Sequence, residues 1–319
     1  MEIGYVEPLR RAVRRTKLLL FSPFDLARWL TIAFAAWLAG LAGGGAPGMR
    51  VGSRGRPSFI FHRPRHLLPP GLENGLWIPL LIGVVVLVVA LLVLLLWLSS
   101  RGKLVFLDNV VQGRAAISEP WRRLAAQGNS LFLWRLGFLL VSVLVGGFIA
   151  AIVIGLAGGP WHLGFSGGRA MLATVFAAGA LVVFGLAVAA VALILDSFIV
   201  PIMYATGLRT SEAWRQFLPW LERYAGPFLL YALFVLVLWI GVAAAVIAAG
   251  LFTCCVGFVL LAIPYVGTVI LLPVFVAYRT YSLEFLAQFH PGFGLLQPLP
   301  APAAGGDAGS QVPPAPPQT

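Results

Sequence analysis

Charged side chains are scarce in this chain: they make up 10% of its 319 residues, whereas soluble domains contain about 25%. Apolar residues make up 60%, more than a water-soluble fold of this length can hide. The composition therefore excludes a soluble globular domain and predicts that lipid is the main solvent. Most of the basic residues behind the net charge of +11 flank apolar runs, which favours contact with anionic lipid headgroups over nucleic acid.

The sequence also lacks the patterns of an active site or a metal centre. Its two cysteines, Cys254 and Cys255, are neighbours in an apolar segment and are interpreted as packing residues. No P-loop, zinc-binding helix or nucleophile elbow occurs. His62 and His66 are spaced i, i+4, but prolines around them argue against a metal-binding helix. We therefore expect no enzyme activity, no cofactor and no metal.

Long apolar runs dominate what is present. Six are long enough to cross a hydrocarbon core of about 30 Å as helices. The sequence thus predicts an all-α fold, a polytopic transmembrane helical bundle in one domain of residues 1–289, in which Pro264 and Pro273 could break the last span. Residues 290–319, rich in Pro, Ala and Gly, are expected to form a disordered tail. The predicted spans are residues 26–44, 76–98, 133–157, 170–195, 228–251 and 256–277.

Three similar pentads precede pairs of these runs. They are Glu7-Pro8-Leu9-Arg10-Arg11, Glu119-Pro120-Trp121-Arg122-Arg123 and Glu212-Ala213-Trp214-Arg215-Gln216. Each is predicted to lie in a short amphipathic helix at the headgroup level. The six spans then form three pseudo-repeats, each an interfacial helix plus a transmembrane hairpin. These helices are either simple elbows or a basic collar for an anionic lipid or a partner protein, with Trp121, Arg122, Trp214 and Arg215 as candidate contacts.

The distribution of Lys and Arg predicts the orientation. With the N-terminus inside, six lie before or at the start of the first span, six between spans two and three or at the start of the third, three between four and five, and one after the sixth. This places 16 of the 22 on the cytoplasmic side, so the positive-inside rule favours two cytoplasmic termini. The basic external loop, residues 45–75, holds five of the other six and runs against the rule.

Small residues recur every fourth position in the first, third and fifth spans, which lets helix backbones approach closely. We therefore expect these three spans to form the centre, and the Val- and Leu-rich second span to face lipid. The stripes are Ala35, Ala39 and Gly43; Gly147, Ala151 and Gly155; Gly241, Ala245 and Ala249.

Asp196 is the acidic residue nearest to an apolar interior. The run that precedes it already covers the hydrocarbon thickness, so Asp196 is expected at the inner interface, paired with a cytoplasmic-side arginine. Arg28 and Arg135 each stand beside a tryptophan near the start of a span. We expect both to extend to lipid phosphates.

Several segments resemble known proteins. They are Asp196-Ser197-Phe198-Ile199-Val200-Pro201-Ile202-Met203, Gly128-Asn129-Ser130-Leu131-Phe132-Leu133-Trp134, Tyr281-Ser282-Leu283-Glu284-Phe285-Leu286 and the Ser-Glu-(Pro/Ala)-Trp-Arg repeats. With them the chain resembles a large group of uncharacterised multi-pass proteins of bacterial inner membranes. It is more distantly similar to the membrane domain of some glycerophosphodiester phosphodiesterases. The resemblance implies a helical membrane fold. It does not carry over phosphodiesterase activity, because no hydrophilic segment approaches the roughly 250 residues of the catalytic barrel.

Three functions remain open. The leading hypothesis is a non-enzymatic, lipid-contacting scaffold or accessory subunit at the cytoplasmic face, which predicts a dry Gly/Ala-packed centre and an interfacial ion pair at Asp196. A transporter or channel for a small or lipidic substrate predicts instead that Asp196 faces a cavity and that a proline breaks the sixth helix. A membrane enzyme would need Asp108, Asp196 and Glu119 or Glu212 to converge on one pocket.

Overall fold

The computed structural model describes residues 4–22, 24–41, 77–156, 168–253 and 256–296, and within these ranges the chain is helical without a strand. Five of the described helices are long and apolar enough to cross a membrane. The predicted all-α fold class is thereby confirmed, and the protein is a multi-pass membrane protein. The elements are α1 (Val6–Phe21), α2 (Leu26–Gly40), α3 (Trp77–Gln112), α4 (Ser118–Arg123), α5 (Ala125–Leu156), α6 (Gly168–Ile194), the π turn η2 (Leu195–Ile199), α7 (Val200–Thr206), α8 (Thr210–Arg223), α9 (Ala225–Phe252), α10 (Val256–Ala262), α11 (Pro264–Leu286) and the 3-10 turn η3 (Pro291–Phe293).

The first and last predicted spans differ from the helices observed. The first corresponds to α2, whose 15 residues reach only about 22 Å. The sixth is divided at Ile263, where the backbone is extended and Pro264 starts α11, because proline favours the first turn of a helix. Pro273 lies inside α11 without ending it. The described residues therefore contain five helices of spanning length, where the sequence predicts six.

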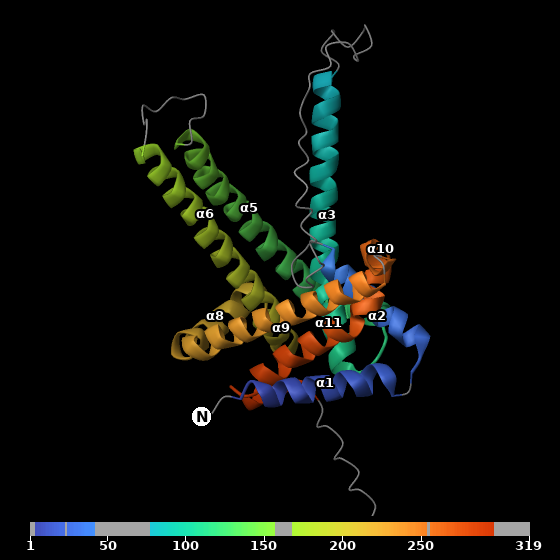
Figure 1. The fold of residues 1–319 in the computed structure, drawn as a ribbon. Helices are drawn as coiled ribbons and strands as arrows, with labels where there is room; N and C mark the ends of the chain where they lie inside the picture. The colour runs from blue at the N-terminus through green and yellow to red at the C-terminus, as the bar shows by residue number, and fades with distance from the viewer. Residues whose placement is uncertain (1–3, 23, 42–76, 157–167, 254–255, 297–319) are drawn as a thin grey trace, which may run out of the picture.

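The long helices do not form one parallel bundle (Figure 1). α3, α5 and α6 extend to the same side of a compact base, with α5 and α6 packed side by side and leaning away from α3. α9 and α11 run across the direction of α3, and α1 lies along α11 (Figure 1). The base, where α1, α2, α7, α8, α11 and the end of α3 meet, is therefore where distant segments of the chain come together.

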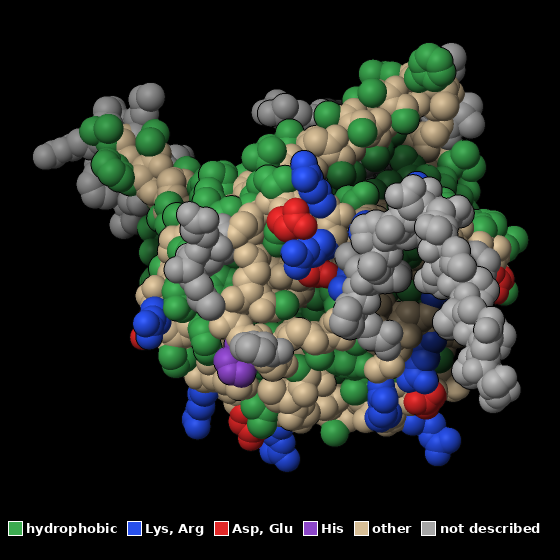
Figure 2. All heavy atoms as spheres, turned by 90° about the horizontal axis from the view of Figure 1, so that it is seen from below, with side chains coloured by type: hydrophobic (Ala, Val, Ile, Leu, Met, Phe, Trp, Pro, Cys, Tyr) green, Lys and Arg blue, Asp and Glu red, His purple; other side chains and the backbone are tan. Residues whose placement is uncertain are grey.

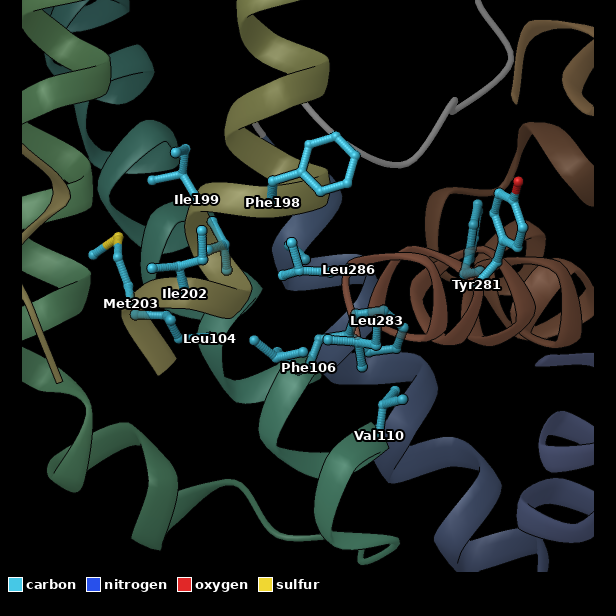
Figure 3. Packing of buried hydrophobic residues seen from close by; sticks show 14 of the residues in the cluster. Leu104, Phe106, Val110, Phe198, Ile199, Ile202, Met203, Tyr281, Leu283 and Leu286 are labelled. Carbon is cyan, nitrogen blue, oxygen red and sulfur yellow. The ribbon is translucent and has the colours of Figure 1, made fainter. Parts of the chain in front are cut away.

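Buried apolar side chains gather in this base. Leu104 of α3, Ile202 of α7 and Leu283 of α11 belong to one cluster (Figure 3). Upstream of the base, residues 79–94 of α3 are exposed, which confirms that the Val- and Leu-rich run faces the surroundings. Because no water-driven collapse acts between apolar helices in lipid, the spans extend beyond the base with little side-chain burial.

Only one of the three small-residue stripes is buried. Ala35 and Ala39 of α2 pack against α3, where a Cβ at Gly102 would lie 2.8 Å from backbone atoms of α2. The described members of the other two stripes whose side chains are placed are exposed, so the prediction that spans three and five line the centre was wrong. Small residues permit close packing but do not require it. These exposed members are Gly147, Ala151, Gly241, Ala245 and Ala249.

The three pentads lie at the starts of α1, α4 and α8. α1 and α8 have the length of amphipathic helices, whereas α4 contains six residues. In α1 the buried positions Pro8, Ala12, Thr16 and Leu20 recur every fourth residue, which places one stripe of the helix against α11. Arg10 and Arg14 are exposed. The threefold repeat itself stays a prediction.

The beginning of the predicted tail is ordered, so that prediction was wrong for residues 290–296. Phe293 is 6% exposed and its ring contacts the His290 ring at 5.5 Å. An aromatic side chain that reaches the base can hold a short segment in place. Residues 297–319, the loop 45–75 that is predicted to be external, and both cysteines lie outside the described residues.

Candidate functional site

Four charged residues from different elements meet at the junction of the base with the long helices. Lys103 follows the exposed apolar run of α3, Arg135 lies in the first half of α5, and Arg279 lies in the second half of α11. Asp196 lies in the π turn η2, whose five residues are all buried. Such single wide turns inside helices are frequent at functional sites. We call Lys103, Arg135, Asp196 and Arg279 the buried charge cluster.

The cluster is held together by charge-assisted hydrogen bonds. Lys103 Nζ donates to the carboxylate of Asp196, and both side chains are less than a tenth exposed. Arg279 Nη1 donates to the backbone carbonyl of Asp196. The Ser197 hydroxyl, next in the π turn, lies 2.9 Å from the Tyr278 hydroxyl. The predicted partner of Asp196 was an arginine, and the carboxylate instead binds a lysine while an arginine binds its backbone.

Arg135 points into the protein, so the prediction that it extends to lipid phosphates was wrong. It is 8% exposed, and its Nη1 donates to the hydroxyls of Ser99 at 3.3 Å and Ser100 at 3.1 Å. α5 packs along α3, which brings these hydroxyls within hydrogen-bonding distance of the guanidinium. Arg28 is half-buried and donates to the carbonyl of Gly113, so it too binds the protein.

A small cavity adjoins the cluster. Its volume is about 30 Å³, room for one or two water molecules. Lys103, Asp196, Tyr278 and Arg279 supply its polar lining. The apolar lining comes from Ala36 and Ala39 of α2, Phe106 of α3 and Phe275 of α11.

A second set of buried polar contacts surrounds Asp108, whose side chain is fully buried. Arg114 Nη2 donates to its carboxylate at 3.2 Å, Arg123 donates to its other oxygen, and the Tyr204 hydroxyl donates at 2.8 Å. Arg114 also donates two hydrogen bonds to Glu119, at 2.7 and 3.1 Å. The bonds from Arg114 lower the pKa of the Glu119 carboxyl. Asp108 therefore joins α3 to α4 and α7.

The carboxylates named for a membrane enzyme are not gathered in one pocket. Asp108 and Glu119 share Arg114, Asp196 binds Lys103, and Glu212 accepts from the backbone N–H that starts α8 at 3.0 Å. Each of these four carboxylates accepts a donor from within the protein. From the sequence, Asp108 is named only as a possible catalytic acid, and Lys103 and Arg279 are not named as site residues. Their one visible signal is a basic residue inside an apolar helix.

The four candidate lipid contacts divide into two kinds. Trp121 is half-buried and its ring meets that of Trp97 edge-on at 6.0 Å. Trp214 is half-buried and stacks on Trp134 at 5.5 Å. Both tryptophans thus pack α4 and α8 against the long helices, as elbows would. Arg122 and Arg215 are exposed, and Lys and Arg side chains are spread over the base seen from below (Figure 2).

The fold and the cluster define a class: a multi-pass α-helical membrane protein with buried charged residues where its long helices join a compact base. The chain matches the model of a family of unknown function, DUF7544, over residues 5–272, and it belongs to that family. No curated protein and no solved structure matches it. The matched region includes Lys103, Arg135 and Asp196 and ends before Arg279.

Proposed function

We propose that this protein is a non-enzymatic scaffold or accessory subunit of a bacterial inner membrane, with both termini and the base on the cytoplasmic side. The single observation that carries the proposal is that the buried charged side chains of the base bind one another across helices. These contacts hold the ends of the long helices together in one platform.

The ion pairs of the base connect segments that are far apart in the sequence. The Lys103–Asp196 pair joins positions 93 residues apart, and Arg15 of α1 binds Glu284 of α11 at 2.6 Å across 269 residues. The cavity beside Asp196, about 30 Å³, is far smaller than the several hundred Å³ of an ordinary ligand pocket. A platform that ties helices together is the use best supported by these contacts.

The outward arginines of the platform support contact with anionic lipid. Arg122 and Arg215 are exposed and have no carboxylate partner among the described residues. Each basic residue near an anionic surface contributes about 1 kcal/mol of attraction. The partner classes proposed are thus anionic headgroups and a protein that docks on the same cytoplasmic face.

Lipid selectivity tests this role. The full-length protein would be reconstituted in phosphatidylcholine with a minor share of spin-labelled phosphatidylglycerol, and the share of protein-bound label measured. Arg122→Gln/Arg215→Gln should lower the relative association constant by up to about 30-fold, since two contacts of about 1 kcal/mol each are lost. The matched Arg122→Lys/Arg215→Lys variant keeps the charge and the selectivity. Equal selectivity in the glutamine variant would contradict the proposal.

A transporter is the second candidate, because Asp196 borders a cavity and the chain breaks at Ile263 before α11. Cysteine accessibility separates the two. Ala36→Cys in a Cys254→Ala/Cys255→Ala background places a thiol in the cavity lining without disturbing an ion pair. Labelling by a membrane-impermeant maleimide from the cytoplasmic side alone, or no labelling, favours the scaffold. Labelling from the outer side requires a water-filled path and favours transport.

A further inference from the structure

The buried charge cluster carries more positive than negative charge. Lys103, Arg135 and Arg279 are each less than a tenth exposed, and Asp196 is the carboxylate with which all three interact electrostatically. The other buried carboxylates of the base are bound elsewhere: Asp108 to arginines near α4, and Glu284 to an arginine of α1. Within the described residues the cluster therefore contains three cationic groups and one anionic group. Burial of charge without a counter-charge costs several kcal/mol per ion, so this arrangement favours a bound anion.

The cavity is where such an anion would reduce the imbalance. Two of the three cationic residues, Lys103 and Arg279, line it. The Nε of Arg279 is buried and has no hydrogen-bond partner among the described residues, although a buried guanidinium N–H ordinarily has one. A donor without an acceptor, on a cationic side chain that borders a void, indicates a missing acceptor.

Size and polarity narrow the class of ligand. The void holds about 30 Å³, the space of one or two water molecules, so a phosphate ester or an organic acid does not fit. Ala36, Ala39, Phe106 and Phe275 form an apolar wall, which offers nothing to a ligand with several hydrogen-bonding oxygens. A monatomic anion needs donors on one side only and tolerates an apolar wall on the other.

We propose that this cavity is a binding site for one small inorganic anion of halide size, held between Lys103 and Arg279. The anion neutralises part of the excess charge of the cluster and stabilises the junction of α2, α3 and α11. The inference stands independently of the scaffold role, because it concerns the occupancy of a cavity and not the partner of the base.

The site is tested by thermal unfolding of the full-length protein in a non-ionic detergent. Sodium gluconate is replaced by sodium chloride or bromide at constant ionic strength, and Tm is followed by the fluorescence of the 10 tryptophans. Chloride and bromide should raise Tm saturably, by about 2 °C at ten times the half-saturating concentration. Equilibrium binding of radioactive chloride should give one ion per chain, displaced by bromide and unaffected by gluconate.

Two variants test whether the ion binds in this cavity. Ala36→Leu fills the cavity without changing a charge, and Arg279→Gln removes the unpartnered donor. Both should abolish the chloride effect, whereas Arg10→Gln on the exposed face of α1 should keep it. Equal Tm of the wild-type protein in chloride and gluconate, or chloride binding that survives in Ala36→Leu, would overturn the proposal. Should either variant fail to fold, the stoichiometry measured on the wild-type protein still decides.

Discussion

Neutralising Asp196 is the sharpest test of the idea that buried pairing holds the base together. Asp196→Asn keeps the shape of the side chain and removes the anionic charge from the cluster. Lys103 would then lie buried beside two arginines. The side-chain exposures of the pair, 5% and 9%, place it in the buried class, for which removal of one partner costs about 3–5 kcal/mol.

Two companion variants test whether this cost in stability arises from the loss of the pair between Asp196 and Lys103. Lys103→Gln should cost less, because Asp196 keeps two arginines nearby. The double variant Asp196→Asn/Lys103→Gln should cost less than the sum of the single changes, with a coupling of about 1–3 kcal/mol. Glu7→Gln is the matched control: its pair with Arg11 is 58% and 54% exposed, so its loss should cost only about 0.3–0.5 kcal/mol.

The assay is equilibrium unfolding in mixed micelles at increasing mole fractions of a denaturing detergent, followed by tryptophan fluorescence. It reports the free energy of unfolding for each variant under one set of conditions. A loss below about 1 kcal/mol in Asp196→Asn, the range of exposed pairs, would refute the reasoning. Strict additivity of the two single changes would also refute it, since the residues would then not act as a pair.

Three further predictions concern other parts of the base. Gly102→Ala should lower the free energy of unfolding by about 1–3 kcal/mol in the same assay, because its Cβ would lie 2.8 Å from α2 backbone atoms, whereas Gly83→Ala, with nothing within 4 Å, should not destabilise. Arg15→Glu should destabilise, and the exchange Arg15→Glu/Glu284→Arg should restore part of the loss, because the largely buried pair joins α1 to α11. The pKa of the Glu119 carboxyl is lowered by its arginine partner. The pair therefore contributes its full stability above the ordinary carboxyl pKa, and this contribution is lost as the pH falls through the lowered pKa. An NMR titration of the Glu119 carboxyl should show the lowered pKa, and Glu119→Gln should remove this pH dependence of the stability.

The fold class could be predicted from composition alone, because a chain with so few charges has no soluble alternative. Five of the six apolar runs correspond to helices of spanning length. The crosswise course of α9 and α11 could not be predicted, since the length and hydropathy of a run carry no information about its direction relative to other spans. The break at Ile263 could be anticipated from Pro264, yet Pro273 is equally visible and does not end a helix.

The candidate site could be predicted only at Asp196, and the reason lies in how charges behave in an apolar chain. A single carboxylate beside an apolar run indicates a charge that is costly to bury and therefore needs a partner. Its partner lies 93 residues away on another helix, and no local sequence pattern indicates which residue that is. Arg135 shows the converse. Its position near a span end is typical of a residue that extends to headgroups, and the hydroxyls of Ser99 and Ser100 draw it inward instead.

Residues within and next to the segments that carry the resemblance to other membrane proteins meet in the base. The Tyr204 hydroxyl donates to Asp108 at 2.8 Å, and the backbone N–H of Thr210 donates to the Ser130 hydroxyl at 3.1 Å. These contacts, and the pair of Ser197 with Tyr278 of α11, join three stretches separated by long apolar spans. Apolar spans can exchange residues freely as long as they remain apolar, whereas a buried polar contact fixes both partners. The polar residues that interrupt the hydrophobic runs therefore identify the part of this protein whose sequence the fold constrains most tightly.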